Sequence, residues 1–430
     1  IRMFRPMESY QKYGGVLTFA RSVGYAVVKK PEGYTTAKVD QIISEYEKKS
    51  ANAQQSTAKQ YPNIITVVNE TFADIKVLGD FKTNEDYMPY FHSLKKNCVT
   101  GYTYASIVGG QTANTEFELL TGNTLGFLSA GTTAFQLYIH GQMPSLVSNL
   151  KAEGYSGNKA MHPFNPYNYN RPAVYKDFGF TDFIDKFDFP KNVKRVREYI
   201  SDEANVDRII SEYEKNRKKT DQPFYMYNMT IQNHSPYDKD AANFKQPIKI
   251  ESSKYDAEAN RYLNLIKYSD DSLKQLTSYF EKCKEPTIIL FLGDHQPRLT
   301  DEFMNKITNG QYQTWSSEQM MKRYQVPFVI WANYDIKEQH IEKTSMNYMQ
   351  SILTQTAGVK MTGYQRFLNE VRKEVPTITS QGYWGKNGKF YQINDKGSPY
   401  YGIIQKYRMI QYNMMFDKKN RRDSFFEVSK

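Results

Sequence analysis

The sequence predicts an α/β fold with a mainly parallel central sheet and helices on both of its faces. Short apolar runs recur along the chain, and stretches with helical spacing of apolar residues lie between them. Strands and helices that alternate at these separations are typical of parallel sheets with both faces covered. Of the 430 residues, 40% are hydrophobic and 24% are charged, which excludes a disordered chain.

The first sixty residues differ from the rest, and we expect them to form a helix followed by a linker. Apolar side chains recur with the spacing of one helix face over residues 36–50. This face carries Val39, Ile42, Ile43 and Tyr46. Residues 51–60 are rich in Ala, Gln and Ser, as linkers are.

Five apolar runs then predict the strands of the sheet. They cover residues 63–69, 155–161, 224–231, 286–292 and 327–331. The clearest helix between them is expected at residues 257–283. From residue 376 the chain is rich in Gly, Tyr and Lys, which indicates a small separate subdomain. The chain is therefore expected to divide into residues 1–60, an α/β domain at 61–375 and a subdomain at 376–430.

Charge, cysteine content and hydropathy restrict the classes of function. The formal net charge of +11 favours an anionic partner, although solubility alone would also account for it. The basic residues are dispersed and match no known motif, so we expect no nucleic acid partner. Cys98 and Cys283 are too few for a disulfide framework or a paired zinc site. The best apolar run near the start, residues 16–28, contains Arg21 and is too short to span a bilayer.

Titratable side chains follow four of the predicted strands. Glu70 follows the first, His162 the second, His234 the third, and Asp294 with His295 the fourth. Because ligands of an open parallel sheet bind beyond the carboxyl ends of its strands, we expect these side chains to meet. A lone histidine at such a place is usually structural, but here four strand ends agree. Carboxylate oxygens and imidazole nitrogens together suit Mn²⁺, Mg²⁺ or Zn²⁺.

Thr112 is the candidate nucleophile. It follows Gly109-Gly-Gln and precedes a stretch that favours a helix, so it would lie at a helix N-terminus. Free N–H groups and the helix dipole favour anions there. A bound divalent cation would favour the alkoxide of a threonine, as it favours hydroxide over water. The alternative is a structural threonine that caps the helix.

Taken together, these residues resemble the lipoteichoic acid synthase family of phosphoglycerol transferases, within the alkaline phosphatase/sulfatase superfamily. The resemblance covers most of the chain, including residues 407–416 near its end, and depends on the order of the motifs and their placement at strand ends. The motifs are Asn-Glu70-Thr-Phe-Ala-Asp, Gly-Gly-Gln-Thr112-Ala-Asn-Thr-Glu-Phe, His162 with Tyr-Asn-Arg171-Pro nine residues on, Asn-His234-Ser-Pro-Tyr and Gly-Asp294-His295-Gln-Pro.

The resemblance implies a role for each of these residues. One divalent cation, Mn²⁺ in the family, would be bound by Glu70, Thr112, Asp294 and His295, and Thr112 would be the nucleophile. The phosphoglycerol group would be bound by His162, Tyr169, Arg171 and His234. Tyr169 stands where the family often has Trp, and Phe164 stands where the lipoteichoic acid synthases proper have an acid. Both departures affect the choice of acceptor.

The resemblance also implies an activity and a location. Glycerol phosphate would pass from a phosphatidylglycerol-like lipid, through a phosphothreonine-type intermediate, to a hydroxyl of a cell-envelope glycan or a glycerol-phosphate polymer. The first residue is Ile, so we expect a fragment or a processed product. Transmembrane helices would precede it and hold the catalytic domain at the extracellular face of the cell membrane, unless the domain is released in soluble form.

Two other functions stay open. A metal-dependent phosphodiesterase or phosphatase would use the same site with water as acceptor. A non-catalytic extracellular glycan-binding domain would use some of the 35 tyrosines as stacking surfaces. A sulfatase activity in the strict sense is not expected, because neither cysteine lies in the C/S-x-P-x-R motif that such enzymes need.

Overall fold

The computed structural model describes residues 11–14, 28–50, 60–251 and 256–428. The expected linker at 51–60 and the apolar run at 16–28 lie almost wholly outside these ranges. Within them, no helix combines the length and the apolar character that crossing a membrane requires.

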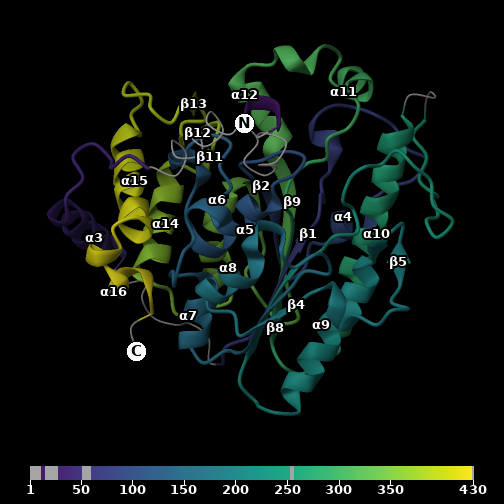
Figure 1. The fold of residues 1–430 in the computed structure, drawn as a ribbon, viewed down its shortest axis with the longest axis horizontal. Coiled ribbons are helices and arrows are strands. Elements are labelled where there is room, and N and C mark those ends of the chain that lie inside the picture. The colour runs from purple at the N-terminus through teal and green to yellow at the C-terminus, as the bar shows by residue number, and fades with distance from the viewer. Residues whose placement is uncertain (1–10, 15–27, 51–59, 252–255, 429–430) are drawn as a thin grey trace.

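An eight-stranded sheet forms the centre of the molecule, with helices on both faces (Figure 1). In spatial order its strands are β10 (Gln339–Ser345), β2 (Cys98–Tyr104), β9 (Gln325–Ala332), β8 (Thr287–Gly293), β1 (Asn63–Asn69), β7 (Phe224–Met229), β3 (Ser156–Met161) and β4 (Asp182–Ile184). The five strands from β8 to β4 are parallel, and so are β10 and β2, whereas β9 runs antiparallel to both of its neighbours. The predicted α/β class and the mainly parallel sheet are confirmed.

All five predicted strands are present in the central sheet, with ends shifted by at most two residues, but its three other strands were not predicted. β2 and β10 contain many polar residues, and β4 has only three residues, so none of them carries the apolar run of a buried strand. The helix expected at 257–283 ends at Phe280, before Pro286 and the strand that follows it.

The two faces of the sheet bury separate apolar clusters, and the central strands contribute to both. In β1, Ile64 and Val68 lie in one cluster, whereas Ile65 and Val67 lie in the other. This double burial explains why the central strands are apolar runs without alternation. One face is covered by α9 (Asp202–Arg217) and α10 (Ala257–Phe280), and the other by α5 (Thr112–Thr121), α13 (Met349–Thr356) and α14 (Gly363–Glu374).

Further helices and two small sheets lie around the central sheet. These helices include α4 (Pro89–Ser93), α6 (Ala134–Leu137), α7 (Leu146–Ala152), α8 (Arg171–Phe178), α11 (Asp301–Ile307), α12 (Ser317–Met320), α15 (Tyr401–Met415) and α16 (Asp423–Phe426). A small hairpin is formed by β5 (Arg195–Val196) and β6 (Tyr199–Ile200). Near the C-terminus, β11 (Thr377–Thr379), β12 (Gly382–Trp384) and β13 (Phe390–Tyr391) form a separate antiparallel sheet.

The predicted N-terminal helix is α3 (Thr36–Ser50), and it packs on the C-terminal helices (Figure 1). The rings of Tyr46 and of Phe367 in α14 meet edge to face with centroids 4.7 Å apart. Lys406 in α15 places its Nζ 2.7 Å from Oε2 of Glu45. The division of the chain at residues 60 and 375 stays a prediction.

Candidate active site

Glu70, Asp294 and His295 meet at the carboxyl edge of the sheet, as the sequence predicts. β1 and β8 are adjacent and in register, with Asn69 opposite Gly293, so the residues that follow them are neighbours. All three side chains are buried, and one potential ligand atom of each lies within 4.8 Å of the others. This is the chemistry of a divalent cation site.

The histidine of this cluster is oriented toward the two carboxylates. Its Nδ1 lies 3.0 Å from the carbonyl oxygen of Gln296, which leaves Nε2 as the nitrogen that faces the cluster. Nε2 lies 3.2 Å from Oδ2 of Asp294 and 3.9 Å from Oε1 of Glu70. It is buried and makes no hydrogen bond within the described residues. A buried, unpartnered imidazole nitrogen beside two carboxylates fits a metal ligand.

Electrostatics in the cluster favour a bound cation. Burial and the neighbouring Asp294 carboxylate raise the pKa of Glu70, because two negative charges are costly at this distance in a buried site. A divalent cation between the two carboxylates would remove this repulsion.

Thr112 is the first residue of α5, and its hydroxyl reaches this cluster. Its Oγ1 donates a hydrogen bond of 2.8 Å to Oδ2 of Asp294. The chain turns sharply before the helix, since Gly109, Gly110 and Gln111 all have positive φ angles. The N-cap position is occupied by Gln111, so the Thr112 hydroxyl is not used to cap the helix.

Backbone groups and hydroxyls fix the cluster in place. Oδ1 of Asp294 accepts hydrogen bonds from the backbone N–H groups of Thr71, at 2.6 Å, and His295, at 2.8 Å. The Thr71 hydroxyl donates to Oε1 of Glu70 at 2.9 Å, and the Thr115 hydroxyl donates to the Asp294 carbonyl at 2.8 Å. These hydrogen bonds form without a ligand, so the side chains of the cluster are already oriented for binding.

Arg171 is paired with a buried carboxylate that the sequence did not reveal as functional. Nε and Nη2 of Arg171 donate to Oε1 of Glu116 at 3.1 and 2.7 Å. Oε2 of Glu116 accepts from the hydroxyl groups of Tyr175 and, at 3.1 Å, Tyr227. Burial alone would lower the pKa of Arg171, but the Glu116 carboxylate outweighs it and raises this pKa. Arg171 is therefore a fixed positive charge.

Glu116 could have been found from its position in the chain. It lies four residues after Thr112 in the same helix and so, like Thr112, on one helix face. Glu116 belongs to the motif that begins with Gly-Gly-Gln-Thr112, but only the fold shows that its partner is Arg171.

Tyr169 lies against the arginine. The Arg171 guanidinium is 5.1 Å from the centre of the Tyr169 ring, in a cation–π contact. Tyr169 and Asn170 both have left-handed backbone conformations, with φ of 61° and 59°. This turn directs the tyrosine ring and the arginine, two residues apart, to the same place.

His162 and His234, the two histidines predicted to bind substrate, flank Phe164. Nδ1 of His162 lies 3.0 Å from the Met229 carbonyl, and burial together with the charge of Arg171 holds the pKa of His162 well below its ordinary range. Burial also lowers the pKa of the half-buried His234, whose Nδ1 lies 2.7 Å from the Ser235 carbonyl. The ring of Phe164 lies 6.1 Å from that of His162 and 6.3 Å from that of His234.

Arg171 and His234 lie close enough to the cluster for their charges to interact with it. Arg171 acts to lower the pKa of Glu70, and Asp294 acts to raise that of His234. Every residue that the sequence singled out is thus at one edge of the sheet. The roles assigned to these residues stay predictions.

Residues 62–359 match the family described as Sulfatase. The chain belongs to the sulfatase family. A Rhizobium meliloti (strain 1021) protein named for cyclic beta-1,2-glucan modification is 30% identical over 99% of this chain and 65% of its own length. Lipoteichoic acid synthase 1 of Bacillus subtilis (strain 168) is 24% identical over 67% of this chain and 44% of its own length. This sulfatase-family chain therefore spans less than two thirds of either relative.

Solved structures share the fold of this sulfatase-family chain. The Streptococcus pyogenes phosphoglycerol transferase GacH, in complex with sn-glycerol-1-phosphate, aligns with a TM-score of 0.74 and 20% identity over 94% of this chain and 100% of that chain. The lipoteichoic acid synthase LtaP from Listeria monocytogenes aligns with a TM-score of 0.60 and 19% identity, over 89% and 97%. The predicted lipoteichoic acid synthase-like identity and the prediction of an enzyme with a sulfatase-like fold are confirmed.

Proposed function

We propose that this sulfatase-family chain transfers glycerol phosphate from a phosphatidylglycerol-like lipid to a hydroxyl group of a cell-envelope glycan or glycerol-phosphate polymer. The main support is the position of the Thr112 hydroxyl, 2.8 Å from Asp294 in the cluster with Glu70 and His295. Similarity to a phosphoglycerol transferase, to a lipoteichoic acid synthase and to a glucan modification protein supports such a reaction.

Glu70, Asp294, His295 and the Thr112 hydroxyl would hold the cation, for which we propose Mn²⁺, with Mg²⁺ or Zn²⁺ as alternatives. Their oxygen and nitrogen donors suit such an ion, and the unpartnered Nε2 of His295 is available to it. When bound, a divalent cation lowers the pKa of an adjacent hydroxyl and offsets charge on phosphoryl oxygens.

The first step forms a covalent intermediate on Thr112. Oγ1 of Thr112 attacks the phosphorus of the lipid headgroup, the bond from phosphorus to the diacylglycerol oxygen breaks, and diacylglycerol takes up a proton and leaves. In the second step an acceptor hydroxyl attacks the same phosphorus, the bond to Oγ1 breaks and Thr112 regains its proton. With water as acceptor the same site would release glycerol phosphate, which is the phosphodiesterase alternative.

Arg171 would hold the phosphate and the histidines would hold the glycerol. Nε and Nη2 of Arg171 donate to Glu116, so Nη1 is the nitrogen that remains for a phosphoryl oxygen. His162 is neutral and its Nδ1 faces a carbonyl, so its Nε2 would accept a hydrogen bond from a glycerol hydroxyl. His234 is half-buried and its pKa is lowered less, so it is the better group to exchange protons with the departing oxygen.

The lipid donor requires a location at a membrane. We propose that the chain belongs to a protein anchored by transmembrane helices, with this domain on the extracellular face of the cell membrane.

The decisive experiment replaces Thr112 with Ala and measures glycerol phosphate release from a phosphatidylglycerol analogue. Thr121→Ala is the matched control, because Thr121 lies at the other end of α5 and bonds only to groups near that end. We expect the control to remain active and Thr112→Ala to lose turnover while it stays folded. A Thr112→Ala protein that keeps more than roughly a tenth of the rate, a loss under about 1.4 kcal/mol in transition-state stabilisation, would exclude Thr112 as nucleophile.

A further inference from the structure

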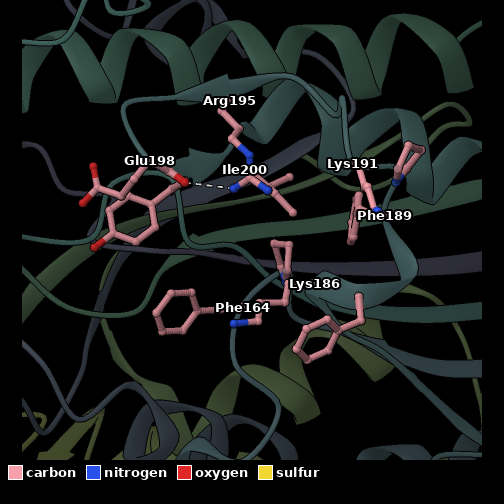
Figure 2. A pocket seen from close by; sticks show the side chains of 11 residues that line it. Phe164, Lys186, Phe189, Lys191, Arg195, Glu198 and Ile200 are labelled. Carbon is pink, nitrogen blue, oxygen red and sulfur yellow. Dashed lines mark hydrogen bonds between the residues drawn. The ribbon is translucent and has the colours of Figure 1, made fainter.

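A cavity of about 540 Å³ opens beside the two substrate-site histidines. It lies between the β5–β6 hairpin, the turn at Lys186–Asp188 and the segment that follows β3. Figure 2 shows its lining side chains around the hollow, with Arg195 and Lys191 on one side and Phe164 and Lys186 on the other. Its volume lies within the range of roughly 300–1,000 Å³ typical of small-ligand sites.

Two residues that line this cavity also contact the histidines of the site proposed for glycerol phosphate. Phe164 lines the cavity and also contacts the rings of His162 and His234. Tyr199 also lines the cavity, and its ring lies 5.7 Å from the ring of His234. The Tyr199 hydroxyl lies 3.3 Å from Nδ1 of His234. A molecule in the cavity would therefore lie next to the side chains that pack against His162 and His234.

Aromatic rings form much of the cavity wall. Phe187 is 74% exposed, which is high for a large apolar side chain, and Lys186 lies 4.9 Å from the centre of its ring. Flat apolar rings suit the C–H faces of sugar rings, which are apolar while their edges carry hydroxyl groups. The walls thus favour a glycan over a small anion alone.

The polar side chains of the cavity are mainly cationic. Lys186, Lys191 and Arg195 line it together with a single acid, Glu198. In the described part of the chain, none of these three cations forms an ion pair with a carboxylate, and Nη1 of Arg195 donates to the backbone carbonyl of Glu198. Three cations around one hollow make a field that favours an anionic group.

We propose that the cavity is the acceptor subsite and binds a sugar unit that bears an anionic substituent, such as a phosphodiester already attached to the glycan. The inference rests on the proposed function. It names the second substrate of that site by its chemistry: a sugar face for Phe187 and Tyr199, and a negative group for Lys191 and Lys186. The acyl chains of the lipid donor are not expected to bind here, because they would displace the water that hydrates these cations, and desolvating a charge is costly.

The test compares transfer with hydrolysis for Phe187→Ala and Lys191→Gln, with Lys219→Gln as control. Phe187 and Lys191 are exposed, so their replacement should leave the fold intact. Lys219 is also exposed, and it precedes the N-terminal end of β7, whereas the candidate site follows the C-terminal end. The probes are cyclic β-1,2-glucan with and without glycerol phosphate substituents, and a phosphatidylglycerol analogue with water alone.

We expect Lys191→Gln to raise KM for the substituted glucan about tenfold, roughly the effect of losing one charge-assisted contact, and to change KM for the neutral glucan less. Phe187→Ala should raise KM for both glucans. Hydrolysis of the lipid analogue should stay within about twofold of the wild-type rate for both variants and for the control.

Three results would overturn the inference. Unchanged transfer by both variants would exclude the acceptor role, a raised KM for the lipid in hydrolysis would assign the cavity to the donor, and equal effects of Lys191→Gln on both glucans would remove the anionic requirement. Calorimetric titration of both glucans into wild type and variants tests the cavity even without turnover. Glucan binding that the variants weaken, in a protein that neither transfers nor hydrolyses, would support the subsite and refute the proposed reaction instead.

Discussion

Replacing Glu116 with Gln is expected to destabilise the protein and to increase the stabilisation that it gains from glycerol phosphate. The change keeps the size of the side chain but removes the charge that lies 2.7 Å from Nη2 of Arg171. Both side chains are almost fully buried, with 2% and 0% of their surfaces exposed. Removing one partner of such a pair leaves an uncompensated charge and costs about 3–5 kcal/mol. A bound phosphate would replace the missing negative charge.

The assay is urea unfolding at pH 7, with and without glycerol phosphate. Glu118→Gln is the matched control, because Glu118 is a second buried glutamate of α5 whose Oε1 accepts from Ser106, Thr124 and Leu125 and which has no cation as partner among the residues that the structure describes. We expect the control to lose much less stability. The reasoning fails if Glu116→Gln is no more destabilising than the control, or if glycerol phosphate stabilises it less than the wild type.

A double variant separates charge from packing. Arg171→Gln together with Glu116→Gln removes both charges, and replacing a buried pair by neutral groups is often nearly neutral for stability. The double variant should therefore unfold at a higher urea concentration than Glu116→Gln. It should also bind glycerol phosphate weakly, because no guanidinium remains. A double variant as unstable as the single one would mean that shape, not charge, is what Glu116 supplies.

Three further predictions concern Glu118 of α5, the proposed metal ligands and Arg171. Burial raises the pKa of Glu118 to about 7 from its ordinary value of 4.5, so the folded state holds this proton more tightly than the unfolded chain does. The free energy of unfolding should therefore fall by up to about 3 kcal/mol between pH 4.5 and pH 7. The Glu118→Gln variant should lack this component of the pH profile. Asp294→Ala and His295→Ala should each lose stoichiometric metal in elemental analysis, and one retained equivalent would refute the ligand set. Arg171→Ala should weaken glycerol phosphate binding in titration while metal content stays intact, and loss of metal would contradict its role.

The sequence predicted the centre of the fold and the site because both follow from local patterns. The apolar runs of β1, β7 and β8 have no alternation, and the residues after them had to meet at one edge. β2 and β10 were not predicted because their sequences contain many polar residues and β10 is an edge strand. An edge strand pairs with one neighbour only, and four of the seven residues of β10 are exposed, so its sequence lacks the apolar run on which strand prediction relies.

Pairings across the fold could not be predicted in the same way. Glu116 and Arg171 are 55 residues apart, and nothing in either segment indicates that they form one buried pair. The place of Phe164 between two histidines depends on the arrangement of β3 and β7, which are separated along the chain by α9. Such contacts are properties of the packed molecule, and the sequence alone does not contain a signal for them.

The contact of α3 with the C-terminal helices determines how the domain would bear a mechanical load. α3 is held by the Tyr46–Phe367 ring contact, by Glu45 with Lys406, and by Asp40, which accepts two hydrogen bonds from Arg422. Tension applied at residue 36 would pass first into α14, α15 and the segment before α16. These contacts would have to shear before the pull reached β1 and, at its end, Glu70. A tether at that point would thus load the C-terminal helices first, and the edge of the sheet that carries Glu70 would lie outside the path of the force.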